Sequence, residues 1–64
     1  MLLWVLEYEI RDNKIYLCPD KTYSEQLKHA LKFESESSAL KFLQSNNALF
    51  SFKPNVYSFE FVEN

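Results

Sequence analysis

Residues 3–10 read Leu3-Trp4-Val5-Leu6-Glu7-Tyr8-Glu9-Ile10, and the predicted fold is built outward from them. In an extended chain, successive side chains point to opposite faces. The even-numbered residues of this stretch are all apolar or aromatic, whereas Glu7 and Glu9 lie on the odd-numbered side. This alternation predicts a strand over residues 3–11, with one face in a core and the other toward solvent.

A second extended run covers residues 14–18, after Asp12-Asn13. Asp and Asn tolerate the positive φ angles of a two-residue hairpin turn, so the two runs should form an antiparallel hairpin. This loop places the apolar residues of both strands on one face and Glu7 and Glu9 on the other. The predicted cross-strand pairs are Ile10–Ile15, Tyr8–Leu17, Glu9–Tyr16 and Glu7–Cys18.

A short helix is expected after the hairpin. Pro19 ends the second strand because it cannot donate a hydrogen bond to a ladder. Thr22 and Glu25 have the spacing of a capping box, which predicts a helix over residues 23–31. An extended connection over residues 31–33 is the alternative at its end.

The main helix is expected over residues 36–46, with Ser35 as its N-cap. Its apolar side chains gather on one face of a helical wheel and are Ala39, Leu40, Phe42 and Leu43. Asn46-Asn47 predicts a stop in the left-handed conformation, since Asn often replaces Gly there.

The tail contains a last strand, because Tyr57, Phe59 and Phe61 alternate with other residues. Phe50 and Phe52 are expected in a loop, with both rings closing the end of the core. A fourth strand over residues 50–52 is the alternative.

These elements predict an α+β fold of the type β-β-(short α)-α-β, in a single domain over residues 1–64. A right-handed crossover places the last strand beside the first. The sheet is therefore three-stranded and antiparallel in the order 2-1-3, with the main helix on its aromatic face and the other face open.

Composition excludes several classes of function. The net charge is −2, which argues against binding nucleic acid by neutralising phosphates. No apolar run approaches the roughly 18 residues of a membrane span. Cys18 is the lone cysteine, and the N-terminus lacks the features of a signal peptide, so a cytoplasmic location is expected.

No enzymatic activity, cofactor or metal site is expected. His29 is the only histidine and has no credible nucleophile beside it in the sequence, so a surface position is expected. Cys18 is expected to be an inert, partly exposed thiol on the side away from the core. A domain this small should also lack room for a pocket of about 300 Å³.

Binding to another protein is the predicted function. The open sheet face should carry Glu7, Glu9, Tyr16 and Glu60, with Tyr16 the ring most expected to be exposed. The second and last strands are both edges, where strand addition or a homodimer can form. An alternative is a nucleic-acid-associated protein, with a patch of Lys21, Tyr23, Lys28 and Lys32.

One segment resembles known proteins and reads Ala30-Leu31-Lys32-Phe33-Glu34-Ser35-Glu36-Ser37-Ser38-Ala39-Leu40-Lys41-Phe42-Leu43. It is similar to an element of small phage and mobile-element accessory proteins, in which a hairpin is followed by A-x-x-F-x-S-x-x-x-A, an amphipathic helix and a last strand. The resemblance implies a host-directed role in the host cytoplasm, such as inhibition of a defence nuclease, of the anti-CRISPR or anti-restriction kind, or of a host enzyme. It assigns no functional residue.

Overall fold

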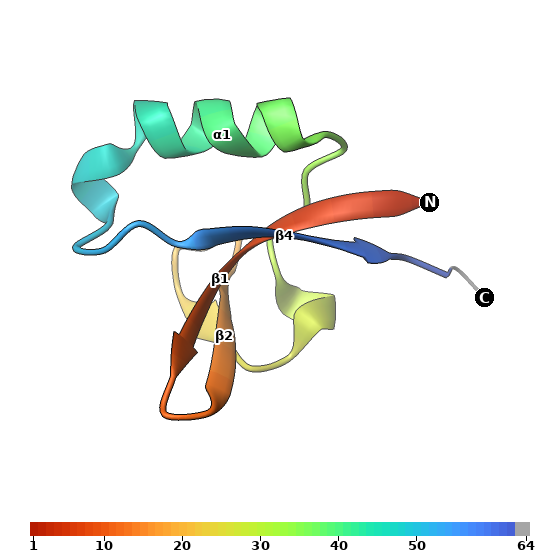
Figure 1. The fold of residues 1–64 in the computed structure, drawn as a ribbon, viewed down its shortest axis with the longest axis horizontal. Coiled ribbons are helices and arrows are strands. Elements are labelled where there is room, and N and C mark those ends of the chain that lie inside the picture. Colours follow the sequence, from red (N-terminus) through yellow and green to blue (C-terminus); the bar gives the residue numbers. More distant parts are fainter. Residues whose placement is uncertain (63–64) are drawn as a thin grey trace.

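The structure, a computed structural model, describes residues 1–62. It has an antiparallel sheet with one α-helix packed on it, so the α+β class is confirmed (Figure 1). The strands are β1 (Leu2–Ile10), β2 (Asn13–Leu17), β3 (Tyr23–Ser24) and β4 (Asn55–Glu60). The helices are α1 (Glu36–Ser45) and two single 3-10 turns, η1 (Leu27–His29) and η2 (Asn47–Leu49).

The strand order within the described residues is β3-β2-β1-β4. β1 is central, with the second strand on one side and the last on the other, as predicted. The prediction of three strands is wrong, because the short β3 pairs with the outer side of β2. Of the two expected edges, β4 is therefore the one that stays an edge along its whole length.

The β1–β2 hairpin forms, but its turn and register differ from the prediction. Arg11 and Asp12, with φ of 49° and 69°, form the two-residue loop in place of Asp12-Asn13. The observed pairs include Tyr8–Ile15 and Glu7–Tyr16, a shift of two residues that keeps every side chain on its expected face. The shift brings Leu17 into one cluster with Leu6, where both are 1% exposed, and this burial favours the observed register.

α1 covers one face of the sheet, and its start is as predicted. The Ser35 hydroxyl accepts a hydrogen bond from the Ser38 N–H at 3.1 Å, which is the expected N-cap. Ala39 and Leu43 are its buried residues and pack in the cluster that contains Leu6. The helix stops at Asn46, but φ there is −125° and the predicted left-handed conformation is absent from this residue. The side-chain amide of Asn46 instead donates a hydrogen bond to the Phe42 carbonyl at 2.9 Å.

The predicted helix over residues 23–31 is wrong. Thr22 is not its N-cap, since the Thr22 hydroxyl donates to the Asp20 carboxylate at 2.6 Å within a tight turn. Residues 23–24 then pair with β2, and only η1 is helical. The extended alternative over residues 31–33 is confirmed, because Phe33 and Trp4 exchange backbone hydrogen bonds of 2.8 and 2.9 Å beside β1.

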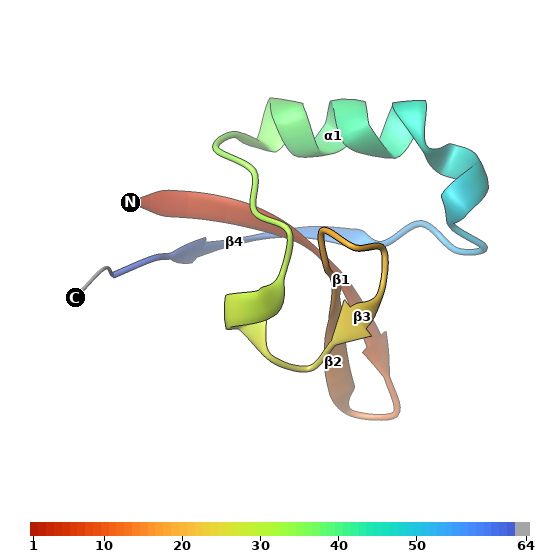
Figure 2. The ribbon, with the colours of Figure 1, turned by 180° about the vertical axis from the view of Figure 1, so that it is seen from behind.

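The second face of the sheet is not open. η1 lies on the side of β1 and β4 opposite α1 (Figure 2). There Val5, Tyr16 and Ala30 form a second buried cluster, with Leu27 and Phe59 packed against it. The sheet is thus covered by α1 on one face and in part by residues 27–30 on the other, and the expectation of a single covered face is wrong.

β4 and the segment before it correct two further expectations. Leu6 pairs with Val56 and Leu2 with Glu60, so the even-numbered residues of β4 face α1 and its aromatic residues face away. Among residues 50–53, Phe50 packs against the core, whereas Phe52 is 79% exposed. The expected loop is therefore confirmed, but only one of its two rings closes the core.

Candidate interaction surface

Glu7 and Tyr16 were predicted on an exposed face, but they are buried. They are direct cross-strand partners, and their exposed fractions are 7% and 8%. Tyr16 lies in the cluster that η1 covers, which explains why the ring is not on the surface. Burial, followed by the adjacent Glu7 carboxylate, raises the pKa of Tyr16 above its usual value.

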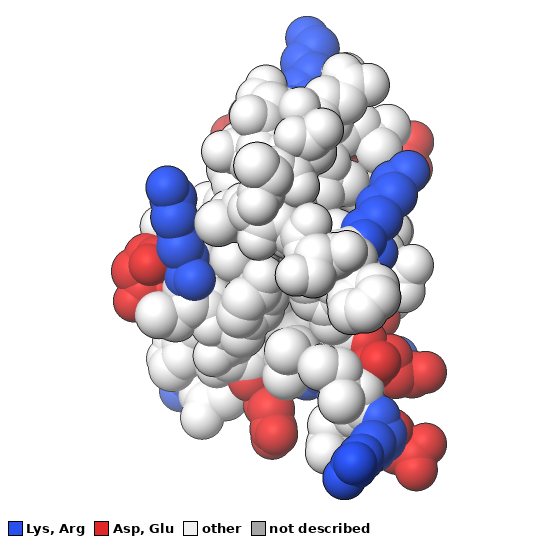
Figure 3. Space-filling model, turned by 90° about the vertical axis from the view of Figure 1, so that its left-hand side faces the viewer, with Lys and Arg blue, Asp and Glu red and all other residues white. Residues whose placement is uncertain are grey.

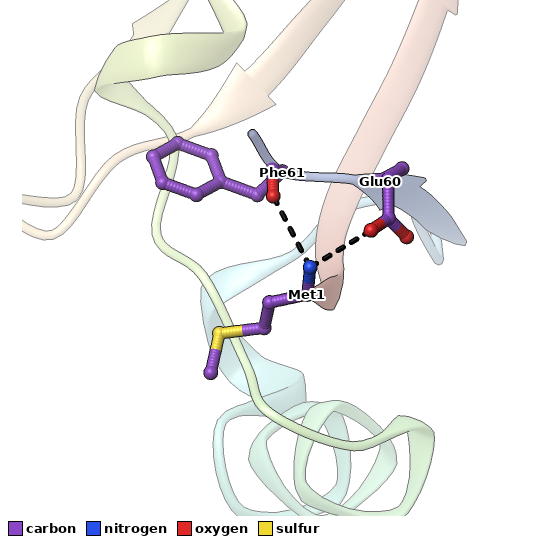
Figure 4. Close-up of polar contacts among 3 residues, drawn as sticks. All are labelled: Met1, Glu60 and Phe61. Atoms are coloured by element: carbon purple, nitrogen blue, oxygen red, sulfur yellow. Dashed lines mark hydrogen bonds and ion pairs between the residues drawn. The ribbon is translucent and has the colours of Figure 1, made fainter. Parts of the chain in front are cut away.

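Glu9 and Glu60 are exposed, but they lie on opposite faces of the sheet. Glu60 accepts a hydrogen bond from the N-terminal ammonium of Met1 at 2.8 Å, and the same ammonium donates to the Phe61 carbonyl at 3.2 Å (Figure 4). An ion pair this exposed is worth little free energy. The four predicted protein-binding residues are therefore not brought together into one surface.

The residues of the nucleic-acid alternative are not all brought together, because Tyr23 lies apart from Lys28 and Lys32. Lys28 and Lys32 lie beside a shallow groove formed with Phe59, Phe61 and Val62. The Lys32 ammonium donates to the carbonyls of Lys28 and Ala30 at 2.9 and 3.0 Å. Tyr23 instead packs on Tyr8, with ring centroids 5.8 Å apart, and lines a different hollow. Lys28 and Lys32 therefore do not form one patch with Tyr23.

Cys18 and His29 line the same open cleft, which sequence reasoning did not anticipate. The cleft has a volume of about 330 Å³ and also contains Asp20, Thr22 and Ser24. His29 is on the surface as predicted, but Cys18 is buried rather than partly exposed because residues 19–29 fold back over it. Among residues 1–62, no group of three or more His, Cys, Asp or Glu side chains is placed to hold a metal ion. Hollows of about 230 to 420 Å³ do occur, so the expectation that the chain has no room for a pocket is wrong.

An exposed group of apolar side chains lies at the tip of the hairpin and was not predicted as a binding surface. It surrounds an open hollow of about 420 Å³. We call it the hairpin patch and define it as Tyr8, Ile10, Ile15, Tyr23, Leu49 and Phe52. The exposed fractions of Ile10 and Phe52 are 53% and 79%. On the side of the molecule that carries η2 and the hairpin, a broad uncharged area is bordered by charged side chains (Figure 3).

The hairpin patch is held together by Tyr8 at its centre. The Tyr8 hydroxyl donates a hydrogen bond to the Phe52 carbonyl, which ties β1 to the loop before β4. The Tyr8 ring lies 5.8 Å from the Tyr23 ring and 6.5 Å from the Phe50 ring. Burial, with a smaller effect from Tyr23, raises the pKa of Tyr8. The hydroxyl therefore stays a neutral donor around neutral pH.

The hairpin patch is exposed because α1 is shorter than β1, and the predicted lengths of the two elements already indicate this difference. The ten residues of α1 extend about 15 Å at 1.5 Å per residue, whereas the nine residues of β1 extend about 30 Å. One helix therefore cannot cover the whole apolar face of β1. Trp4 and Leu6 pack in the core against which α1 lies, while Ile10 projects beyond it.

Comparison of the chain with protein-family models, with curated proteins and with solved structures gave no match. Within residues 1–62, no helix has the length and apolar character that a membrane crossing requires.

Proposed function

We propose that this protein is a non-enzymatic protein-binding module and that the hairpin patch is its principal binding surface. Isolated exposed apolar residues are common on proteins, but a contiguous group around a hollow is typical of an interaction site. The main support for this proposal is that Ile10 and Phe52, both more than half exposed, border the same hollow as two tyrosines. Aromatic residues are enriched at protein interfaces.

The partner that fits this surface is a protein with a projecting apolar side chain. The walls of the hollow are mostly apolar and include no charged side chain, so a charged side chain of the partner would lose hydration there without gaining an opposite charge. Charged residues of both signs, Arg11 and Asp12 among them, border the patch at the hairpin turn. They would form the polar rim of the interface.

The finer part of the proposal is that the partner is a host protein and that binding inhibits it. This part rests on the resemblance of residues 30–43 to phage and mobile-element accessory proteins. A defence nuclease and a host enzyme are both targets of this class. Neither requires a reaction by the small protein itself.

The test compares two substitutions on the same face of β1. The partner is first identified by capture from host lysate, and its affinity for the purified protein is then measured by calorimetry. Ile10→Lys, in the patch, should weaken binding at least tenfold, about 1.4 kcal/mol. Leu2→Lys is the matched control, because Leu2 is 47% exposed on the same face at the far end of the strand. Equal effects of the two substitutions would overturn the proposed surface.

Nucleic-acid binding is the alternative function, and the separation of Tyr23 from Lys28 and Lys32 gives it little support. Titration of labelled single-stranded DNA and RNA at low and physiological salt tests it directly. A steep loss of affinity with salt that Lys28→Ala reduces would favour this alternative.

A further inference from the structure

The outer edge of β4 offers a regular row of backbone groups. Phe61 donates its N–H to the Met1 carbonyl, so the odd-numbered residues of this segment point their backbone groups toward β1. Trp4, which is opposite Ser58, exchanges its hydrogen bonds with Phe33 on the other side of β1. The backbone groups of Val56, Ser58 and Glu60 therefore point outward, and no strand within residues 1–62 pairs with them.

This edge lacks the usual protection against pairing. Natural edges are commonly blocked by lysine, proline or a bulge. The register of β4 with β1 is unbroken from Asn55 to Glu60, so no bulge interrupts it. Residues 56–59 read Val-Tyr-Ser-Phe, which are uncharged and mostly good strand formers. Pro54 stands just before the strand and leaves its middle free.

We propose that two copies of this chain pair antiparallel along β4, around a two-fold axis at Ser58. The two sheets would then form one continuous sheet. In this register Ser58 lies opposite Ser58 of the second copy, and Val56 lies opposite Glu60. All outward N–H and C=O groups of these three residues are then satisfied. A register centred on Tyr57 is less favourable because it places Glu60 opposite Pro54, which has no N–H.

The same register improves the packing on the face away from α1. Tyr57 is 42% exposed, and it would lie opposite Phe59 of the second copy, with the same pair repeated by symmetry. Aromatic cross-strand pairs of this kind stabilise antiparallel sheets.

The side of α1 that lies above β4 favours a second copy of the chain, rather than a single peptide strand, as the partner that pairs with β4. The Phe42 ring packs against the Phe33 ring, with centroids 5.4 Å apart, and Phe33 pairs with Trp4 on the β2 side of β1. Gln44, on the opposite flank, lines a groove with Lys53 and Pro54 at the start of β4. Leu40 precedes Gln44 by one helical turn, so it lies on the flank above β4, and it is 39% exposed.

Pairing of two copies would cover this leucine. α1 packs against both β1 and β4, and neighbouring strands lie about 4.8 Å apart. The two α1 helices of the pair would therefore be about 10 Å apart, which is a normal helix packing distance. Leu40 of each copy would face the other helix. A peptide strand added to the edge of a single copy would leave its Leu40 exposed.

The test is the molar mass of the protein by sedimentation equilibrium from micromolar to millimolar concentration. The expected result is a closed dimer. Ser58→Lys should weaken dimerisation at least tenfold, and circular dichroism should stay unchanged because Ser58 is exposed and its N–H has no strand partner among residues 1–62 of its own chain. Ser45→Lys, an exposed serine at the far end of α1, is the control with the same charge change. Leu40→Glu should weaken dimerisation as well, without any change to the sheet.

Three outcomes would overturn the inference. One is a monomer at millimolar concentration, and another is a dimer that Ser58→Lys does not weaken. The third is mass that keeps growing with concentration, which would indicate open rather than two-fold association. Ile10→Lys separates this inference from the proposed function. It should leave the dimer intact and weaken partner binding, whereas Ser58→Lys should do the reverse.

Discussion

Glu7 and Tyr16 face each other across β1 and β2, in a part of the sheet where polar groups are poorly solvated. One oxygen of the buried Glu7 carboxylate has no hydrogen-bond partner among residues 1–62. The cost of such a group is about 1–3 kcal/mol. The buried carboxylate therefore lowers the stability of the fold, and its negative charge also disfavours the phenolate form of Tyr16.

The raised pKa of Tyr16 predicts a loss of stability in alkaline solution. A phenol whose pKa is higher in the folded state stabilises that state fully below the unfolded value, about 10. This contribution disappears as the pH rises from about 10 through the folded-state pKa. Urea unfolding at pH 8 and at higher pH should show the decline in the free energy of unfolding. Tyr16→Phe should make the decline shallower, and an unchanged slope would contradict the assignment to this ring.

The hairpin register predicts unequal costs for two neighbouring core substitutions. Leu17→Ala should cost about 2–5 kcal/mol, because Leu17 is 1% exposed and truncation leaves a cavity. Ile15→Ala should cost less, because Ile15 is only half-buried and lines the open hairpin patch. Chemical denaturation measures both changes. A larger loss for Ile15→Ala would show that the apolar cluster is assigned to the wrong pair of positions.

Among the elements, α1 was the easiest to predict, since the helical spacing of its apolar residues and the N-cap are both local signals. The segment 19–31 was the hardest. Thr22 and Glu25 have the spacing of a capping box, but the Thr22 hydroxyl bonds Asp20 and the backbone that follows pairs with β2. A tertiary strand partner outweighed a weak local preference. The sequence has no pattern that reveals such a partner.

The contrast between these two caps is itself testable. Ser35→Ala should destabilise the protein by about 1 kcal/mol, because it leaves the first turn of α1 without its N-cap. Thr22→Ala should cost less, since it removes one exposed hydrogen bond and no helix depends on it. Thermal unfolding of the two variants gives the comparison. Equal destabilisation would indicate that residues 23–31 are helical after all.

For the whole molecule, the connection rules for strands correctly predicted that β1 lies between β2 and β4, but they did not predict which faces of the sheet are covered. Hydrophobic alternation assigns residues to faces and does not tell which segment covers each face. Residues 27–30 cover the face with Glu7 and Tyr16, while α1 is too short for the tip of the other face. The expected binding surface was therefore buried, and an apolar surface was left exposed at the hairpin. The position of such a binding site depends on which parts of the sheet stay exposed. This in turn depends on packing between segments that are distant in the sequence, and a single sequence does not reveal that packing.

Amide hydrogen exchange would test the sheet as a whole, because its strand order fixes which backbone groups are protected. In dilute protein, the N–H groups of Tyr57 and Phe59 should exchange slowly, since they bond to β1, whereas those of Val56 and Ser58 should exchange quickly. Raising the concentration should slow the exchange of Val56, Ser58 and Glu60 alone, because pairing of two β4 edges satisfies the outward N–H groups of these three residues. Protection of the Trp4 N–H, which already bonds to Phe33, should not depend on concentration while the monomer stays folded. If all amides of β4 slowed equally with concentration, dimerisation would be stabilising the monomer globally rather than adding bonds at its edge.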